Sequence, residues 1–365
     1  MARFSEVFED VTKEGHKIPK ESYLSEGLYP IIDQGQEYIA GYSNEKTGLY
    51  ERVPAIIFGD HTRIIKYVDM PCFLGADGVK LLRAKPPDVN HKYLYYALCN
   101  ARIPDTGYNR HFKWLKETDI PLPGVSKQNH IVSVLDKIND LIALRKQQLT
   151  KLDELVKARF VEMFGDNGKQ VPLTEYVWFQ EGPGVRSADF SDSGTVLLTG
   201  SNINDNTISF GHKSDRFICN ELASGKYAHF ICNKGDILVV SSAIDPDKFD
   251  KKVVVVENDE KYCLNTGIIR FKPDKRYLTC GYFREFLKSD YFKHQVNSEM
   301  RGIAQMHFGP SHLKQMTILL PDSLDRQMEF ELFVQRVDKS KLTIQQALDK
   351  LVILKDSLMQ TYFTV

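Results

Sequence analysis

The chain has 365 residues, and its 48 basic and 48 acidic side chains give a formal net charge of zero, so any contact with nucleic acid has to come from a local basic surface. Apolar residues make up 42% and charged residues 26%, which is typical of a globular protein long enough for two domains of about 150 residues each. The six cysteines form no CxxC pair, the N-terminal residues carry charges throughout, and no apolar run approaches the ~20 residues of a membrane span. We therefore expect a cytoplasmic chain with reduced thiols, no signal peptide and no contact with a membrane.

Residues 1–119 are predicted to form a mixed, strand-rich domain. Short runs rich in β-branched and aromatic residues, bounded by Gly, Pro and Asp, predict strands at 29–32, 38–42, 53–58 and 79–83. Residues 93–98 (YLYYAL) are predicted to be a helix, because a strand there would crowd aromatic side chains on both of its faces.

The run 59–63 (GDHTR) offers an acid, a base and a hydroxyl together after a predicted strand. Adjacent residues on one loop rarely converge on a single reacting atom, so the run does not predict a catalytic site. We interpret it as a polar turn, or as a loop that offers His61 and Arg63 to DNA or another partner.

Residues 107–116 (GYNRHFKWLK) combine basic and aromatic side chains and contain no acid. Cations neutralise phosphates, while Asn and His can contact the sugar-phosphate backbone or reach base edges. The stretch therefore predicts DNA contacts from Asn109, Arg110, His111 and Lys113. The alternative, which is compatible with the first, is a loop that packs its aromatic side chains into the core and leaves the cations in solvent.

Residues 120–164 carry the pattern around which the chain is organised. The prolines of the lead 120–123 (IPLP) keep a helix from starting earlier, Ser126 is the predicted N-cap, and nothing interrupts a helix before Gly165. Arg145 and Arg159 occupy two positions of a seam in which apolar residues recur at steps of four and three. This spacing is typical of a coiled coil, and the apolar members are Ile131, Leu135, Ile138, Ile142, Leu149, Leu152, Val156 and Met163. A helix of roughly 38 residues would be about 57 Å long, which suits a spacer.

Residues 166–322 are predicted to form a second strand-rich domain. Strands are predicted at 195–198, 236–240, 253–256 and 267–271, with a helix near 282–288. The run 246–252 (PDKFDKK) imitates the Pro-Asp…Asp-x-Lys pattern of nucleases, but its spacing is too tight to place the acids on neighbouring strands. We interpret it as a solvated loop that offers Lys248 to a phosphate. The run 300–308 (MRGIAQMHF) holds further predicted DNA contacts, namely Arg301, Gln305 and His307.

A second long helical pattern runs over residues 327–363, and a shift of 199 residues superimposes the first helix on it. The shift places Gln128 on Gln327. It also sets the first seam on an equivalent set of positions that includes Phe330, Val334, Val337, Leu348 and Leu351. Upstream of each helix, 110–112 (RHF) matches 306–308 (MHF). The chain is therefore predicted to be a tandem repeat of a domain followed by a long helix.

One long helix after each domain allows the two helices to pair antiparallel within a single chain, which would relate the domains by a pseudo-two-fold axis. A dimerisation coil between two chains is the alternative. Lys341 and Lys355 stand on the second seam, as the two arginines stand on the first. Burying an unpaired cation is costly, so part of the seam is expected to be wet, salt-bridged or covered by another protein.

These features resemble the specificity subunit of a type I restriction-modification system, and the resemblance covers nearly the whole chain. Its most specific parts are the lead 120–123 with Gln128, the segment 135–164, and a weaker copy from residue 319 onward. The second helix departs from the pattern because it lacks a clean proline-rich lead.

The resemblance implies an α+β fold with two strand-rich target recognition domains and two spacer helices in an intramolecular antiparallel coiled coil. The implied boundaries are 1–119 and 166–322 for the recognition domains, and 120–165 and 323–365 for the helices. Each recognition domain would read one half of a split DNA sequence in the major groove. The helices would fix the unread gap, which is roughly 17 base pairs for a rod of about 57 Å.

The resemblance also implies partners: double-stranded DNA, two methylation subunits docked on the helices, and restriction subunits that join them. Adenine-N6 methylation with S-adenosylmethionine, and restriction with ATP and Mg, would be performed by those partners. This chain would bind no cofactor and catalyse no reaction. The sequence agrees, since it lacks a phosphate-binding loop, a GxGxxG fingerprint and the Asn/Asp-Pro-Pro-Tyr/Phe motif of amino-methyltransferases. The remaining alternative is a standalone two-domain DNA-binding or scaffold protein that dimerises through its long helices.

Overall fold

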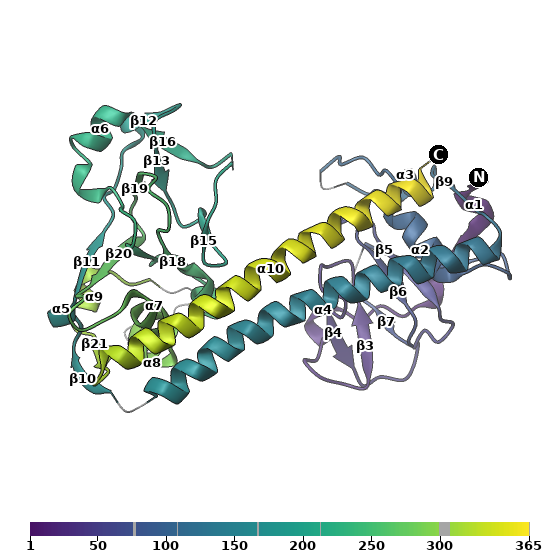
Figure 1. The fold of residues 1–365 in the computed structure, drawn as a ribbon. Helices are drawn as coiled ribbons and strands as arrows, with labels where there is room; N and C mark the ends of the chain where they lie inside the picture. Colours follow the sequence, from purple (N-terminus) through teal and green to yellow (C-terminus); the bar gives the residue numbers. More distant parts are fainter. Residues whose placement is uncertain (76–77, 108, 166–167, 212, 299–306, 365) are drawn as a thin grey trace. The chain divides into compact units, whose positions relative to one another are not determined.

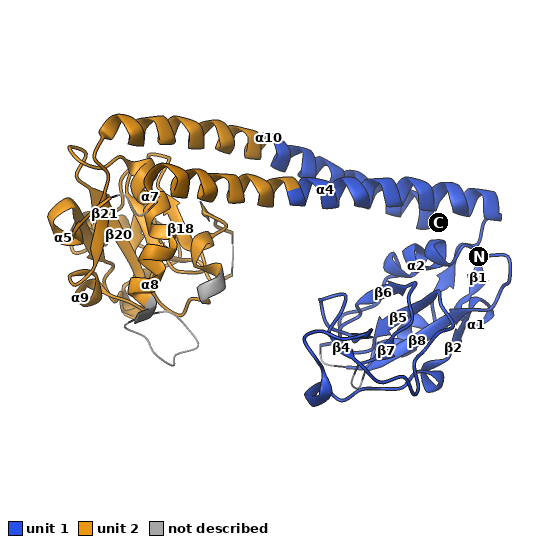
Figure 2. Cartoon of the chain, turned by 90° about the horizontal axis from the view of Figure 1, so that it is seen from below, with its two compact units in different colours: residues 1–147, 344–365 blue, residues 148–343 orange. Residues whose placement is uncertain are grey.

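The structure is a computed structural model, and it describes residues 1–75, 78–107, 109–165, 168–211, 213–298 and 307–364. Its contacts divide the chain into two compact units, unit 1 with residues 1–147 and 344–365, and unit 2 with residues 148–343 (Figure 2). Each unit combines a mixed α+β body with part of both long helices, α4 (Val125–Phe164) and α10 (Leu324–Phe363).

The body of unit 1 contains short strands and three short helices. The strands are β1 (Ala2–Arg3), β2 (Phe8–Asp10), β3 (Tyr29–Ile32), β4 (Gly41–Ser43), β5 (Ala55–Gly59), β6 (Ile65–Val68), β7 (Phe73–Leu74), β8 (Val79–Ala84) and β9 (Asp119–Ile120). The helices are α1 (Phe4–Val7), α2 (His91–Cys99) and α3 (Phe112–Leu115).

The body of unit 2 is larger but similarly built. Its strands are β10 (Lys169–Pro172), β11 (Val177–Glu181), β12 (Phe190–Ser191), β13 (Thr195–Leu198), β14 (Ile203–Asn204), β15 (Thr207–Ile208), β16 (Arg216–Ile218), β17 (Ile237–Val240), β18 (Val253–Val255), β19 (Tyr262–Leu264), β20 (Ile268–Pro273) and β21 (Thr317–Leu320). Its helices are α5 (Leu173–Tyr176), α6 (Asn220–Ser224), α7 (Cys280–Lys288), α8 (Asp290–Ser298) and α9 (Pro310–Leu313).

The main sheets of the two bodies share one strand topology, which confirms the predicted tandem repeat. Each body contains a four-stranded antiparallel sheet, in the order β2-β8-β5-β6 in unit 1 and β11-β20-β17-β18 in unit 2. Each also contains a second sheet with a parallel pair, β3 with β7 and β13 with β19. The first and last strands of each body pair with one another, β1 with β9 and β10 with β21 (Figure 1).

The run 246–252 is not the solvated loop predicted from its charges. It forms a 3-10 helix (Pro246–Lys252) in which the side chain of Phe249 is fully buried. The carboxylate of Asp250 pairs with the ammonium groups of Lys157 and Lys293. The one apolar residue of the run therefore anchors it in the core, and its second acid is used for ion pairs.

A buried glutamine near the start of each long helix holds that helix on the body. Gln128 accepts a hydrogen bond from the backbone N–H of Asn90 at 2.9 Å and donates one to the carbonyl of Pro123 at 2.7 Å. Gln327 accepts from the backbone N–H of the N-cap residue of α7 at 2.9 Å and donates to the carbonyl of Tyr277 at 2.9 Å. Because both side chains are buried, these two pairs of bonds fix the same joint in both repeats.

A tyrosine on the short helix of each body contacts the lead of the long helix. The hydroxyl of Tyr93 on α2 donates to the carbonyl of Pro121 at 2.8 Å, and the hydroxyl of Tyr282 on α7 donates to the carbonyl of Leu319. A phenylalanine at the far end of the other long helix packs on each ring, Phe363 on Tyr93 and Phe164 on Tyr282. The two phenylalanines, Phe164 and Phe363, lie 199 positions apart in the chain.

The long helices α4 and α10 pair antiparallel in each unit, as predicted. In unit 1 the start of α4 shares a core with the end of α10, through residues such as Leu135 and Met359. In unit 2 the end of α4 packs on the start of α10, where the ring of Phe330 lies 5.6 Å from that of Phe160, between centroids. In both views the two helices lie side by side (Figures 1 and 2).

The predicted seam positions of both helices are buried or half-buried. Buried members are Ile131, Leu135, Ile138, Val156, Phe330, Val334, Val337 and Leu348. Half-buried members are Ile142, Leu149, Leu152 and Leu351.

Two cations of the seam are salt-bridged. In unit 2 the guanidinium of Arg159 reaches Glu329 across the helix pair at 3.0 Å, and the ammonium of Lys341 reaches Asp153. The predicted salt-bridged seam is therefore present at these two positions.

The start of α4 differs from the prediction by two residues. The helix begins at Val125, and the carbonyl of Gly124 accepts the N–H groups of Lys127 at 2.9 Å and Gln128 at 3.1 Å. Ser126 therefore lies inside the first turn and is not the N-cap. The other end agrees with the prediction, because the helix stops at Phe164, directly before Gly165.

Candidate nucleic-acid interface

The hairpin between β5 and β6 ends in a tight turn formed by residues 59–63. The N–H of Arg63 donates to the carbonyl of Gly59 at 2.7 Å, and the N–H of Gly59 donates to the carbonyl of Ile64 at 2.8 Å. Arg63 has a φ of 62°, a left-handed conformation that is uncommon for a residue with a Cβ and tends to occur at functional sites. The hydrogen bonds of the turn hold this arginine in place.

The loop after β3 packs against one side of the turn through Gln34. Its side-chain oxygen accepts the N–H of His61 at 3.1 Å, and its backbone carbonyl accepts the hydroxyl of Thr62 at 2.7 Å. Gly78 allows Gln34 to pack this closely, because a Cβ there would lie 2.6 Å from the side-chain nitrogen of Gln34. Its φ of +87° is also one that residues with a Cβ rarely adopt.

The segment that precedes α3 packs against the other side of the turn. The guanidinium of Arg63 pairs with Asp105 at 2.7 Å, and Nδ1 of His61 donates to the carbonyl of Asn109 at 3.2 Å, since a carbonyl can only accept. The backbone N–H of Gly107, together with the Arg63 guanidinium, holds the pKa of Asp105 below its usual range. Three segments far apart in the sequence therefore meet at one end of the sheet.

Most of the predicted contacts of unit 1 are accessible to a partner. Asn109, Arg110 and Lys113 are exposed, while His61 and Arg63 are half-buried. The ammonium of Lys113 lies 4.1 Å from the ring centroid of Trp114, so the cation stands over an aromatic face. The aromatic core packing expected as an alternative also holds, because Phe112 of the same stretch is buried.

His111 is the exception, because its side chain is fully buried. Its Nδ1 donates to the carbonyl of Asp60 at 3.0 Å, and its ring packs 5.4 Å from that of Trp114, between centroids. A buried imidazole cannot reach DNA, so we withdraw His111 from the set of DNA contacts and assign it to the support of the neighbouring segment. The sequence could not show this, because periodicity does not say which side of a short irregular stretch turns inward.

The corresponding end of unit 2 contains two of the predicted contacts. His307 is exposed, and its Nδ1 lies 2.8 Å from the hydroxyl of Ser242. Lys248 is exposed and lies 3.4 Å from Asp245. Arg301 and Gln305 lie outside the described residues.

Apolar side chains that the seam does not use are exposed on both long helices. In unit 1 they include Leu141 and Leu144 on α4 and Ile353 on α10, and Ile353 is 69% exposed. In unit 2 they include Val161 on α4, which is 65% exposed, and Leu342 on α10, which is 60% exposed. Since the seam residues are buried, a partner that binds these helices has to use this second set, which the seam pattern does not identify.

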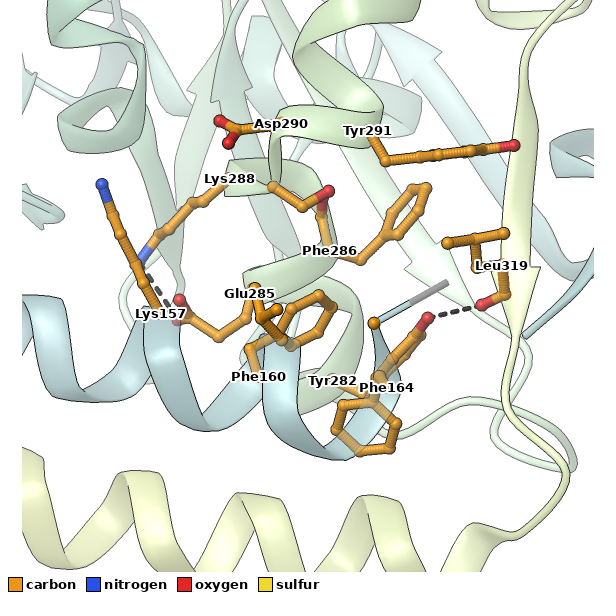
Figure 3. A pocket seen from close by; sticks show the side chains of 13 residues that line it. Lys157, Phe160, Phe164, Tyr282, Glu285, Phe286, Lys288, Asp290, Tyr291 and Leu319 are labelled. Carbon is orange, nitrogen blue, oxygen red and sulfur yellow. Dashed lines mark hydrogen bonds and ion pairs between the residues drawn. The ribbon is translucent and has the colours of Figure 1, made fainter. Parts of the chain in front are cut away.

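A cavity of about 230 Å³ lies between the last turns of α4 and helix α7 in unit 2 (Figure 3). Its walls are mainly aromatic, with Phe160, Phe164 and Tyr282 among the lining residues, and one side carries Glu285, whose carboxylate pairs with Lys288 at 3.2 Å. This volume is below the range of typical ligand sites, and the pair of charges satisfies itself. We interpret the cavity as part of the joint between the helix and the body.

The structure gives no support for metal chemistry or membrane insertion in the part of the chain that it describes. Among those residues, no three His, Cys, Asp or Glu side chains come together in a way that could hold a metal ion. None of the helices within the described ranges is long and apolar enough to cross a bilayer.

Comparisons with known proteins show similarity to one family. The family described as type I restriction modification DNA specificity domain matches residues 1–154. The specificity subunit of the type I restriction enzyme EcoR124I/EcoR124II from Escherichia coli is 26% identical over 215 residues, which are 52% of this chain and 51% of that protein. Residues 1–154 therefore match this specificity domain family, and the chain is similar to specificity subunits of type I restriction-modification systems.

A second similar protein is the MjaVIII specificity subunit of Methanocaldococcus jannaschii. It is 24% identical over 285 residues, which are 68% of this chain and 65% of that protein. The matched parts therefore span about half of the first relative and just under two thirds of the second.

Solved structures share the fold of this chain over nearly its whole length. The S subunit of the type I restriction-modification system from M. genitalium superimposes with a TM-score of 0.55 and 17% identity, covering 98% of this chain and 94% of that one. A chain from a study of complex assembly and conformational transition of the type I R-M system gives a TM-score of 0.53 and 14% identity, covering 99% and 95%. At these identities the likeness concerns the fold alone.

Proposed function

We propose that this chain is the DNA-recognition subunit of a type I restriction-modification complex, and that each unit reads one half of a bipartite DNA sequence. The observation that carries the proposal is the repeated body. Two bodies of one topology each present polar and basic side chains at the same end of the main sheet, and each is held on the same helix pair. A duplicated reader on a continuous helix pair suits a target with two separated halves.

The chemistry at the two ends suits a division between phosphate and base contacts. In unit 1 the exposed Lys113 is placed to neutralise a phosphate. Arg110 can donate to acceptors on base edges in the major groove, and Asn109 can both donate and accept there. Arg63 and His61 lie beside them and complete the candidate surface. In unit 2 we assign the equivalent roles to Lys248, Arg301, Gln305 and His307.

The paired helices would set the distance between the two half-sites. Each has 40 residues, which corresponds to a length of about 60 Å at 1.5 Å per residue. Because the seam of each helix is filled by the other within the same chain, no free seam remains on the described residues for the standalone dimer considered above.

We propose that the exposed apolar side chains of the helices dock two methylation subunits, which restriction subunits then join. Adenine-N6 methylation with S-adenosylmethionine, and restriction with ATP and Mg, would be carried out by those partners in the cytoplasm. This chain would bind no cofactor and perform neither reaction itself.

A mixing experiment tests the proposal. The purified chain, the methylation subunits and both together are incubated with genomic DNA, and N6-methyladenine is mapped. We expect methylation only in the mixture, at a bipartite sequence. Methylation or cleavage of DNA by the chain alone would refute the assignment of a non-catalytic specificity subunit.

Single substitutions then assign the half-sites. Arg110→Ala is expected to weaken discrimination in one half of the mapped target, and His307→Ala in the other half, so each variant is the control for the other. A good side chain-to-base contact contributes about 1–3 kcal/mol of discrimination. Lys113→Ala is expected to weaken binding to all sequences and to lower the salt slope by about one. Unchanged affinity and discrimination in all three variants would remove this surface as the candidate.

The docking surface has its own test. Ile353→Asp is expected to abolish capture of the methylation subunits, because it places a charge in an apolar contact without touching the seam. Lys350→Asp on the same exposed part of α10 is the matched control. Equal capture by wild type and the Ile353 variant would show that the partner does not use this part of α10.

A further inference from the structure

The buried carboxylate of Asp60 joins the hairpin turn of unit 1 to the segment that carries the candidate DNA contacts. Asp60 is only 4% exposed. Its Oδ1 accepts the backbone N–H of Phe112 at 2.7 Å, and its backbone carbonyl accepts both the backbone N–H of His111 at 2.8 Å and the Nδ1–H of that residue at 3.0 Å. Its own N–H donates to the carbonyl of Gly78 at 2.7 Å. One residue therefore ties together three segments of the chain.

Unit 2 contains the same arrangement with different side chains. The N–H of Ser241 donates to the carbonyl of Gly267 at 2.8 Å, as Asp60 does to Gly78, and both glycines have a positive φ. The carbonyl of Ser241 accepts the N–H of Phe308 at 2.9 Å, and the hydroxyl of Ser242 lies 2.8 Å from Nδ1 of His307. The two histidines are the ones that the repeat aligns, so a related joint recurs in unit 2, although its backbone bond is displaced by one residue and no carboxylate takes part.

We propose that Asp60 is a positioning residue for DNA recognition: it holds residues 109–112 in one conformation and thereby sets how well the first half-site is discriminated. The proposal rests on the proposed function of unit 1 as a DNA reader. It concerns a residue that cannot itself touch DNA, because its carboxylate is buried behind the segment it holds.

The chemistry of the site favours a positioning role over simple core packing. A buried ionised group is costly, whereas an apolar side chain would fill the same space without that cost. The side-chain oxygen accepts a hydrogen bond from the N–H of Phe112, at the start of α3. That bond fixes the backbone two residues after Arg110. The backbone that carries the Arg110 guanidinium is therefore already ordered before DNA binds, and less conformational entropy is lost on binding.

The test uses the full chain in complex with methylation subunits, after the bipartite target has been mapped. The variants are Asp60→Ala, which removes the acceptor, and Asp60→Asn, which keeps an oxygen acceptor in the same place. Asp69→Ala, which changes an exposed acid of the same body, is the control. The measurements are the affinities for DNA altered in one half-site or the other, and hydrogen exchange at the N–H groups of His111 and Phe112.

We expect Asp60→Ala to lower discrimination at the first half-site about tenfold, to leave the second half-site unchanged, and to speed exchange at these two N–H groups. Asp60→Asn is expected to keep discrimination and exchange close to wild type, because its amide oxygen can accept the same hydrogen bond; a role that depends on the charge of Asp60 would be lost. Faster exchange with unchanged discrimination would overturn the proposal, and so would an equal loss at both half-sites. A wild-type complex without sequence preference would instead refute the proposed function, while the exchange measurement would still report on the joint.

Discussion

Replacing Gln327 by Met is the sharpest test of how the long helix is held on the body of unit 2. Gln327 is fully buried, and its amide makes two hydrogen bonds, one from the N–H of Thr279 and one to the carbonyl of Tyr277. Methionine has a similar length and volume, so it fills the space without a large cavity. The substitution therefore removes two hydrogen bonds and little else.

The magnitude follows from the two groups that lose their partners. Tyr277 is exposed and Thr279 half-buried, so water can replace part of what is lost. At about 0.5–1.5 kcal/mol net for each hydrogen bond, the free energy of unfolding of unit 2 should fall by about 1–3 kcal/mol. With a urea slope of about 2 kcal/mol per molar, the midpoint should fall by about 0.5–1.5 M. Gln128→Met should have an effect of the same size on unit 1, since Gln128 also makes two such bonds.

The two tryptophans make the assay selective, because Trp114 lies in unit 1 and Trp178 in unit 2. Unfolding of unit 2 is followed by the fluorescence of Trp178 in a Trp114→Phe background. Gln335→Met, at an exposed position of α10 in the same unit, is the control. If Gln327→Met shifts the midpoint no more than this control does, the buried amide contributes nothing net and the reasoning fails.

Three further predictions concern charge and burial. Burial alone would raise the pKa of Glu285, but Lys288 and neighbouring cations lower it overall. The stability that Glu285 contributes is therefore present above its unfolded pKa of about 4.3 and is lost as the pH falls through the lower folded value. Glu285→Gln should make the free energy of unfolding, measured with urea between pH 3 and 6, fall less steeply towards low pH. Lys341→Met should change the free energy of unfolding by less than about 1 kcal/mol, because an apolar seam residue replaces a partly exposed ion pair; a loss above 2 kcal/mol would contradict this. Burial raises the pKa of Cys72 and Cys232 to about 12, so both thiols should resist iodoacetamide at pH 8 until urea unfolds the chain, as peptide mass mapping would show.

The sequence predicts the long helices and their pairing well because a seam spacing of four and three is a local property that the chain repeats after 199 residues. Strands of four or more residues, such as β5 and β17, are also predictable from their composition. The second sheet is not, because strands of two residues such as β7 carry no periodicity. Its parallel pairing joins segments more than forty residues apart, which local propensity does not encode.

The candidate interface divides in the same way. A basic and aromatic stretch before α3 is visible in the sequence, and most of its cations are exposed as predicted. The role of Asp60 is not visible, because its partner His111 lies 51 residues away in the chain and the two meet only in the folded structure. The side chain of His111 is buried because of that contact. The stretch alone therefore does not show that His111 is buried while Arg110 is exposed.

The contact between the short helix of the body and the long helix uses different side chains in the two units, and this difference has a functional consequence. In unit 1 the hydroxyl of Tyr96 on α2 donates to Asp136 of α4 at 2.6 Å, and burial, together with that carboxylate, raises the pKa of the phenol, so it remains a neutral donor at any working pH. Asp136 also pairs with Lys92 of α2 at 2.8 Å, so this joint has an ionic contact as well. In unit 2 Arg284 of α7 lies 3.4 Å from Asp338 of α10. Ionic contacts at a partly exposed position weaken with salt, whereas the hydrogen bond from Tyr96 does not. At high ionic strength both joints should therefore weaken, but unit 1 should keep the Tyr96 bond, so discrimination at the half-site of unit 2 should fall first.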